Sequence, residues 1–295
     1  MYKKNLLREY IQDSSLRTFK DLIYVRLSKE LAKNYDNWLY NNYLNCLYDS
    51  YKQLLSLNLK QPYNWIPNLY VYIVPDDNYT ELLSYPAKYN KWTGWGRPVK
   101  CYDLDWYIQA YGVSQNLCTN YPEKPTIPRI ENNIHELTHI ICGQFTYYKW
   151  TTINEWLAET VPLYILDYEK LFTEHRDAIL SLKQEDIFTA LELFSSEKDN
   201  SFGTTSIYPK KTCSFRYSYM SSYLFVRWLL EAIEEIKWLS KVWALQYFLE
   251  LLKNSEYSRE RLILDISDIL WLNSDEIMEW KIIQNKAILS IKENG

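Results

Sequence analysis

Ile130-Glu-Asn-Asn-Ile-His135-Glu136-Leu-Thr-His139-Ile-Ile-Cys-Gly143 is the stretch that decides how this chain folds and what chemistry it can carry. His135 and His139 are four residues apart, so on a helix they lie one turn apart on the same face. That spacing allows both imidazoles to bind one Zn²⁺. Glu136 is offset by one residue, where its carboxylate can reach a metal-bound water without binding the metal. Because the metal lowers the pKa of that water, Glu136 can accept its proton.

A third metal ligand is expected in the segment that follows, Ile153-Asn154-Glu155-Trp156-Leu-Ala-Glu159-Thr160. Catalytic zinc takes three protein ligands and keeps one position open. Glu155 and Glu159 share one face of a helix whose other residues are largely apolar, and carboxylates on a buried helix need partners. We predict that one of them binds the metal and that the other hydrogen-bonds a ligand histidine.

The two stretches together resemble the gluzincin metallopeptidases, the superfamily of thermolysin and the zinc aminopeptidases. In that superfamily His-Glu-x-x-His precedes a helix with Asn-Glu-x-x-x-Asp/Glu or Glu-Gly-x-Ala-Glu, and Asn154-Glu155-Trp156-Leu-Ala-Glu159 fits both, with Trp156 in place of the frequent Gly. The resemblance implies a Zn²⁺ site made of His135, His139 and Glu155, with Glu159 and Asn154 beside the ligands. The spacing also leaves Glu159 open as the ligand: it follows His139 by 20 residues, as in thermolysin, whereas Glu155 follows by 16.

The resemblance also implies a catalytic tyrosine. The run from Arg216 to Glu231, which contains Tyr217, Tyr219 and Tyr223, resembles the helix that carries this residue in the aminopeptidase branch. Attack of water on a peptide carbonyl places negative charge on its oxygen, which a hydrogen-bond donor opposite the metal stabilises. We predict Tyr219 as this donor, with Tyr217, Tyr223 and His175 as the other candidates.

Three functions are compatible with these motifs. The expected one is zinc-dependent cleavage of internal bonds in a peptide or protein substrate. An aminopeptidase of the same superfamily usually carries Gly-x-Met-Glu-Asn before the zinc helix; residues 84–128 lack it, and Glu123 is their only glutamate. A binding or regulatory module that retains a zinc site is the third, and the intact Glu136 argues against it because a metal site without catalysis needs no base.

The remaining pattern predicts an α+β fold in which helices dominate. We expect a helix over 16–58, a strand over 69–74, and short strands and loops over 84–127, with two domains: a helical segment at 1–60 and a gluzincin-like metallopeptidase domain at 61–295, helical from about 165. Gly143 should end the zinc helix. Pro162 lacks an N–H and should kink the helix after Glu159. The expected helices are 129–142, 153–167, 174–182, 185–195, 218–234, 237–253, 258–271 and 275–291.

Composition excludes several classes of protein. The net charge is −4 and no basic stripe occurs, so nucleic acid is not an expected partner. The sequence contains no run of 18 apolar residues, so no membrane span is expected. Five cysteines without close pairing indicate neither a disulfide framework nor a cysteine zinc site, and Cys142 is expected to pack in the core. Because residues 1–12 lack the apolar centre of a signal peptide, we expect a cytoplasmic protein; the alternative is the mature form of a secreted protein, without its signal peptide.

Overall fold

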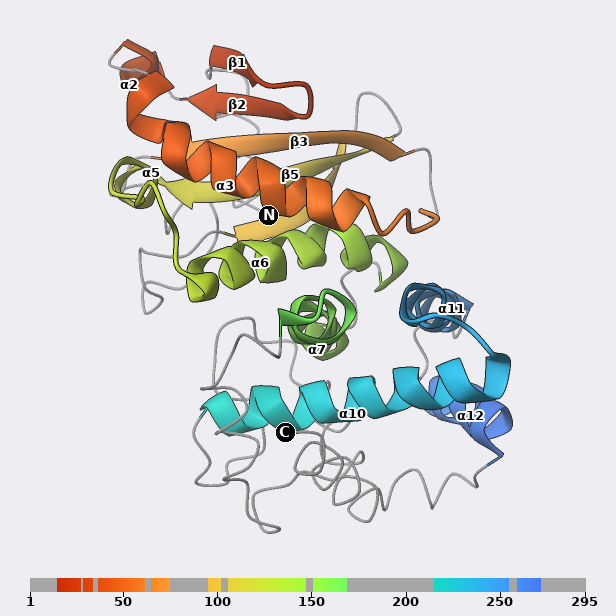
Figure 1. The fold of residues 1–295 in the computed structure, drawn as a ribbon. Helices are drawn as coiled ribbons and strands as arrows, with labels where there is room; N and C mark the ends of the chain where they lie inside the picture. The colour runs from red at the N-terminus through yellow and green to blue at the C-terminus, as the bar shows by residue number, and fades with distance from the viewer. Residues whose placement is uncertain are drawn as a thin grey trace. The chain divides into compact units, whose positions relative to one another are not determined.

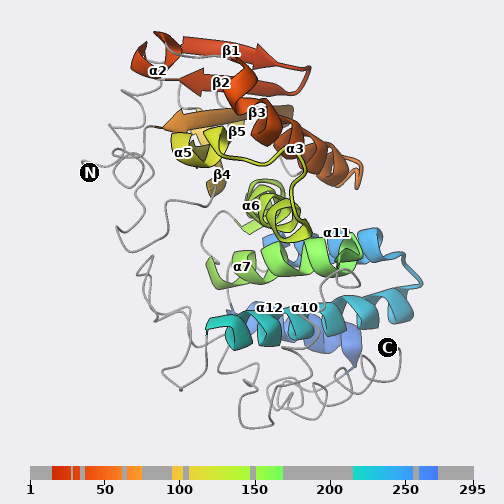
Figure 2. The same ribbon diagram turned by 60° about the vertical axis from the view of Figure 1, so that its left-hand side comes forward.

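The protein has a helix-dominated α+β fold with one small mixed sheet (Figures 1 and 2). A computed structural model describes residues 15–27, 29–33, 37–61, 65–74, 95–101, 106–146, 151–168, 215–254 and 259–271. These residues belong to two compact units, Met1–Ile141 and Cys142–Gly295. No helix among the described residues is long and apolar enough to cross a membrane.

The first unit contains a five-stranded sheet with the order β1-β2-β3-β5-β4. Its strands are β1 (Ser15–Phe19), β2 (Ile23–Leu27), β3 (Trp65–Val74), β4 (Trp95–Cys101) and β5 (Trp106–Ser114). The three inner strands run parallel to one another, and each edge strand is antiparallel to its neighbour. The central strand β3 is rich in β-branched and aromatic residues and is almost fully buried from Val71 to Val74, as expected of a parallel strand.

Helices of the first unit are α2 (Lys29–Lys33), α3 (Asn37–Leu55), α5 (Gln115–Thr119) and most of α6 (Ile127–Thr146). Helix α3 runs across one face of the sheet (Figures 1 and 2), where the Tyr43 hydroxyl donates to the Tyr111 hydroxyl of β5 at 3.2 Å. The chain turns from β5 into α5 at Ser114, whose hydroxyl accepts a hydrogen bond from the Leu117 N–H at 3.2 Å and so caps the helix.

The described part of the second unit is entirely helical. It consists of α7 (Thr151–Thr160), the π-helical turn η2 (Val161–Ile165), α10 (Phe215–Lys237), α11 (Lys241–Asn254) and α12 (Arg259–Leu270). Helix α10 packs against α7, α11 and α12. Trp156 of α7 meets Phe225 of α10 edge to face, with ring centroids 5.8 Å apart. Apolar stripes on α10, α11 and α12 form the rest of this core, with Leu229, Ile233, Leu245, Leu249 and Ile266 fully or almost fully buried.

The predicted helix over 16–58 is wrong for its first part. Residues 15–27 form β1 and β2, and only 37–55 form the long helix α3. In β2 the buried Ile23, Val25 and Leu27 alternate with half-exposed residues, which is the period of a strand. Because β2 pairs with β3, the sheet joins residues on both sides of the domain boundary expected after residue 60.

The later helix predictions over 129–142, 153–167, 218–234, 237–253 and 258–271 are confirmed with shifted ends. Contrary to the expectation, Gly143 does not end α6, because the helix continues to Thr146. A glycine inside a helix costs up to about 1 kcal/mol relative to alanine, and the burial of Ile141 and Phe145 around it offsets that cost. The expected helices at 174–182, 185–195 and 275–291 lie outside the described residues.

Candidate metal centre

Helix α6 presents the two predicted histidines on one face. Ile134, Leu137 and Ile141 recur at helical spacing and are buried, so this apolar stripe fixes which side of α6 faces the core. His135 and His139 are half-buried, and their ring centroids lie 5.0 Å apart with the ring planes at 83°. The predicted pairing of the two imidazoles is therefore present within a single helix.

A buried polar cluster anchors α6 to the rest of the first unit. The Asn133 amide donates to Cys46 Sγ of α3 at 3.4 Å and to the Tyr121 hydroxyl at 3.3 Å. Cys46 and Tyr121 also contact each other at 3.4 Å. Burial raises the pKa of the Cys46 thiol and of the Tyr121 phenol, so both stay protonated and uncharged at neutral pH.

This cluster controls the rotation of α6 about its own axis. Asn133 precedes His135 by two residues, which places it about 200° around the helix from that histidine. A polar group that must meet two partners tolerates little rotation, since an unpaired buried amide is costly. Anchoring Asn133 therefore directs His135 and His139 away from the core of the first unit.

Glu136 lies next to His135 and is buried, with 9% of its surface exposed. A carboxylate in this place, next to a candidate metal ligand, is suited to accept a proton from a metal-bound water. It lies on α6, one residue beyond the first histidine.

Helix α7 carries the candidate third ligands. Glu155 is half-buried, while Asn154 and Glu159 are buried at 6% and 8% exposure. Ile153, Trp156 and Leu157 are also buried, so the prediction that these carboxylates belong to a largely buried helix is confirmed. Glu155 and Glu159 lie one turn apart on α7.

Two sets of three side chains among the described residues offer ligand atoms suitable for a metal ion. One is His135, His139 and Glu155, the set predicted from the sequence; the other is Glu131, His135 and Glu159. Only the first uses both histidines. Its two nitrogens and one carboxylate oxygen are the donor atoms of many catalytic zinc sites.

Glu131 was not predicted from the sequence. It precedes His135 by four residues, so it extends the face of α6 that carries the histidines. The same i, i+4 spacing that identified His139 could have identified Glu131.

The candidate catalytic tyrosines lie on α10. The backbone of Tyr217 and Tyr219 forms the first turns of this helix, but their side chains lie outside the described part of the chain. Tyr223 is fully buried, and its hydroxyl accepts a hydrogen bond from Arg227 Nη1 at 3.3 Å. Tyr223 is therefore a packing residue, and Tyr219 remains the predicted donor. His175 lies outside the described residues.

The described cysteines are core residues. Cys46, Cys118 and Cys142 are free thiols and all three are buried. Burial raises the pKa of Cys142 to about 12, so it is an uncharged packing residue, as predicted.

Comparison with known proteins identifies no relative that would assign a role to this centre. The chain matches no family model, no curated protein and no solved structure.

Proposed function

We propose that this protein is a zinc-dependent endopeptidase whose metal is bound by His135, His139 and Glu155. The observation that carries the proposal is the histidine pair on α6, with ring centroids 5.0 Å apart and Glu136 next to the first histidine. A second support is the donor set of His135, His139 and Glu155, which could hold a metal ion.

The donor chemistry fits zinc better than the common alternatives. Imidazole nitrogen suits zinc and other transition metals, whereas Ca²⁺ and Mg²⁺ prefer sites made of oxygen ligands. Two histidines and one glutamate leave a fourth position open, which a hydrolytic site needs. Bound there, Zn²⁺ would lower the pKa of a water and polarise the substrate carbonyl.

The protein's own residues supply the rest of the chemistry. Glu136 accepts a proton from the attacking water and can return it to the leaving amine. Glu159 and Asn154, both buried on α7, hold the ligands in orientation. Tyr219 donates a hydrogen bond to the carbonyl oxygen as charge develops on it.

Internal cleavage is preferred to removal of N-terminal residues because of what the sequence lacks before the zinc helix. In the aminopeptidase branch the free amine is captured by the glutamate of Gly-x-Met-Glu-Asn; residues 84–128 lack this motif, and their only glutamate is Glu123, within Tyr-Pro-Glu-Lys-Pro. A module that binds metal without catalysis is disfavoured because it would have no use for a buried carboxylate at Glu136.

The test combines metal analysis with peptide cleavage. Purified protein should contain one zinc per chain by elemental mass spectrometry and should cleave casein. A chelator should abolish cleavage, and added zinc should restore it. Peptides with acetylated N-termini should be cleaved as well as free ones if cleavage is internal.

Each alternative has a distinct outcome. Cleavage of free but not acetylated peptides would indicate an aminopeptidase. Bound zinc without cleavage of any member of a broad peptide library would indicate a binding module. Protein that binds no zinc under any loading condition contradicts the proposal altogether.

A further inference from the structure

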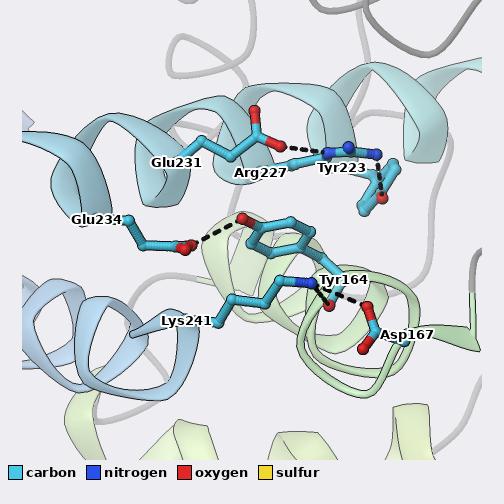
Figure 3. A network of polar contacts seen from close by, with 7 residues as sticks. All are labelled: Tyr164, Asp167, Tyr223, Arg227, Glu231, Glu234 and Lys241. Atoms are coloured by element: carbon cyan, nitrogen blue, oxygen red, sulfur yellow. Dashed lines mark hydrogen bonds and ion pairs between the residues drawn. The ribbon is translucent and has the colours of Figure 1, made fainter. Parts of the chain in front are cut away.

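Tyr164, in the π-helical turn after α7, lies between two cations and an acid (Figure 3). Lys241 Nζ lies 4.3 Å from the centroid of its ring, and Arg227 Cζ lies 5.2 Å from it. The Tyr164 hydroxyl donates to Glu234 Oε1 at 2.7 Å. Tyr164 itself is buried, and its ring and hydroxyl together contact both α10 and α11.

The π-helical turn brings Tyr164 to this place. In a regular α-helix, Tyr164 would be about 80° around the axis from Trp156, eight residues earlier. A π-turn accommodates one extra residue, which returns Tyr164 to about 20° from Trp156. The widened turn is closed by the Leu166 N–H, which donates to the Val161 carbonyl at 3.0 Å. Trp156 and Tyr164 thus both face α10.

Lys241 also hydrogen-bonds backbone and side-chain oxygens at the end of the π-helical turn. Its Nζ donates to the Tyr164 carbonyl at 3.3 Å and to Asp167 Oδ1 at 2.8 Å (Figure 3). A carbonyl in the last turn of a helix has no N–H partner within that helix, so the ammonium replaces one. Asp167 has a φ of 58°, a left-handed conformation that ends the helical segment.

The guanidinium of Arg227, the second cation beside the Tyr164 ring, is held by its own hydrogen bonds. Arg227 Nε donates to Glu231 Oε1 at 2.9 Å, and Arg227 Nη1 donates to the Tyr223 hydroxyl at 3.3 Å. These two contacts hold the guanidinium in the orientation in which Tyr164 packs on it. The ion pair between Lys241 and Asp167 is largely exposed, so it contributes little to stability.

We propose that Tyr164 is a positioning residue that fixes the rotation of α7 against α10 and thereby sets the direction of the Glu155 and Glu159 carboxylates. Helix α7 packs against α10, and the ring contact from Trp156 to Phe225 lies near the middle of α7. The contact of Tyr164 with Arg227 of α10 lies eight residues further along the chain, with Glu159 between the two aromatic residues, so the two contacts together limit rotation of the segment that carries this carboxylate. The inference rests on the proposed function, in which Glu155 is a metal ligand.

Two substitutions separate the ring from its hydroxyl. Tyr164→Phe keeps the ring between the cations and loses the bond to Glu234, whereas Tyr164→Leu loses both. We expect Tyr164→Leu to weaken zinc affinity about 10–100-fold, the range for residues that orient metal ligands. Tyr164→Phe should stay close to wild type. Zinc affinity is measured by competition with a chromophoric chelator, and the visible spectrum of the Co²⁺-loaded protein reports the ligand geometry.

The control is Leu262→Ala, a truncation in the buried core of α12. It should lower the melting temperature of the metal-free protein while leaving zinc affinity and the Co²⁺ spectrum unchanged. Equal weakening by Leu262→Ala and Tyr164→Leu would show that general stability is responsible and would overturn the proposal. The proposal would also be overturned if Tyr164→Leu showed the zinc affinity and the Co²⁺ spectrum of the wild-type protein. The proposed function would then still stand, provided that the wild-type protein binds one zinc. Failure of wild type to bind zinc contradicts the proposed function itself.

Discussion

The imidazole rings of His135 and His139 lie 5.0 Å apart, centroid to centroid, with their planes at 83°. Two imidazoles one turn apart on a rigid helix can bind one metal ion with little loss of conformational freedom. Glu136, next to the first of them, is buried.

His135→Ala should abolish zinc retention. The substitution removes one of three proposed ligands and leaves a two-ligand site that a chelator readily strips. Zinc content after dialysis against a weak chelator is the measurement, with circular dichroism to show that α6 still folds. A full equivalent of zinc in this variant would place the metal elsewhere.

Glu136→Gln should keep the fold and the zinc but lose hydrolysis. Gln has nearly the same shape as Glu but cannot accept the proton of the water at neutral pH. Loss of a general base of this kind costs on the order of 10²–10⁴ in rate. The kcat on a fluorogenic peptide, together with zinc content, tests the role. Turnover close to wild type would remove Glu136 from the mechanism.

Glu155→Ala should weaken zinc binding far more than Glu159→Ala. Removing a ligand opens the coordination shell, whereas removing a residue that orients a ligand costs about 10–100-fold in affinity or activity. Chelator competition on both variants gives the two affinities side by side. The reverse order would identify Glu159 as the ligand and favour the longer spacing from His139.

The histidine pair could be predicted from the sequence because its signal is local: the two histidines are four positions apart on one helix. The choice between Glu155 and Glu159 was left open, since both share a face of α7 and the packing of helices decides which one reaches a metal. Pro162 predicted an interruption after Glu159. It did not predict that the chain continues as a π-helical turn and carries Tyr164 onto α10.

The first strands were missed for a different reason. Strand β2 has only five residues, so its alternation is brief and lies close to the long helical pattern of α3. What stabilises it is pairing with β3, in which Ile23 lies opposite Leu69. Pairing with a strand as distant in sequence as β3 does not change the local spacing of apolar residues in β2. The helical prediction over 16–58 therefore extended too far.

Tyr51→Phe and Tyr43→Phe should have opposite effects on stability. Both tyrosines are fully buried on α3. The Tyr43 hydroxyl donates to Tyr111, whereas the Tyr51 hydroxyl has no hydrogen-bond partner among the described residues. Tyr51→Phe removes an unpaired buried polar group and should raise the free energy of unfolding by about 1 kcal/mol, while Tyr43→Phe should lower it by about 0.5–1.5 kcal/mol.

Urea denaturation of both variants tests this pair of effects, since each substitution removes one oxygen from the same helix. Equal destabilisation by the two would show that the Tyr51 hydroxyl contributes a bond after all.

Tyr219→Phe should lower kcat by about 10²–10³ without changing zinc content, because it removes one donor to the developing oxyanion and almost no volume. Tyr223→Phe is the matched control. Tyr223 lies one turn further along α10, is fully buried, and has its hydroxyl on Arg227 at 3.3 Å, so its loss should affect stability and leave kcat unchanged. Single-turnover kinetics separate the chemical step from product release. If kcat of Tyr219→Phe stays within a few-fold of wild type, Tyr219 packs rather than donates, and the donor must be Tyr217 or His175.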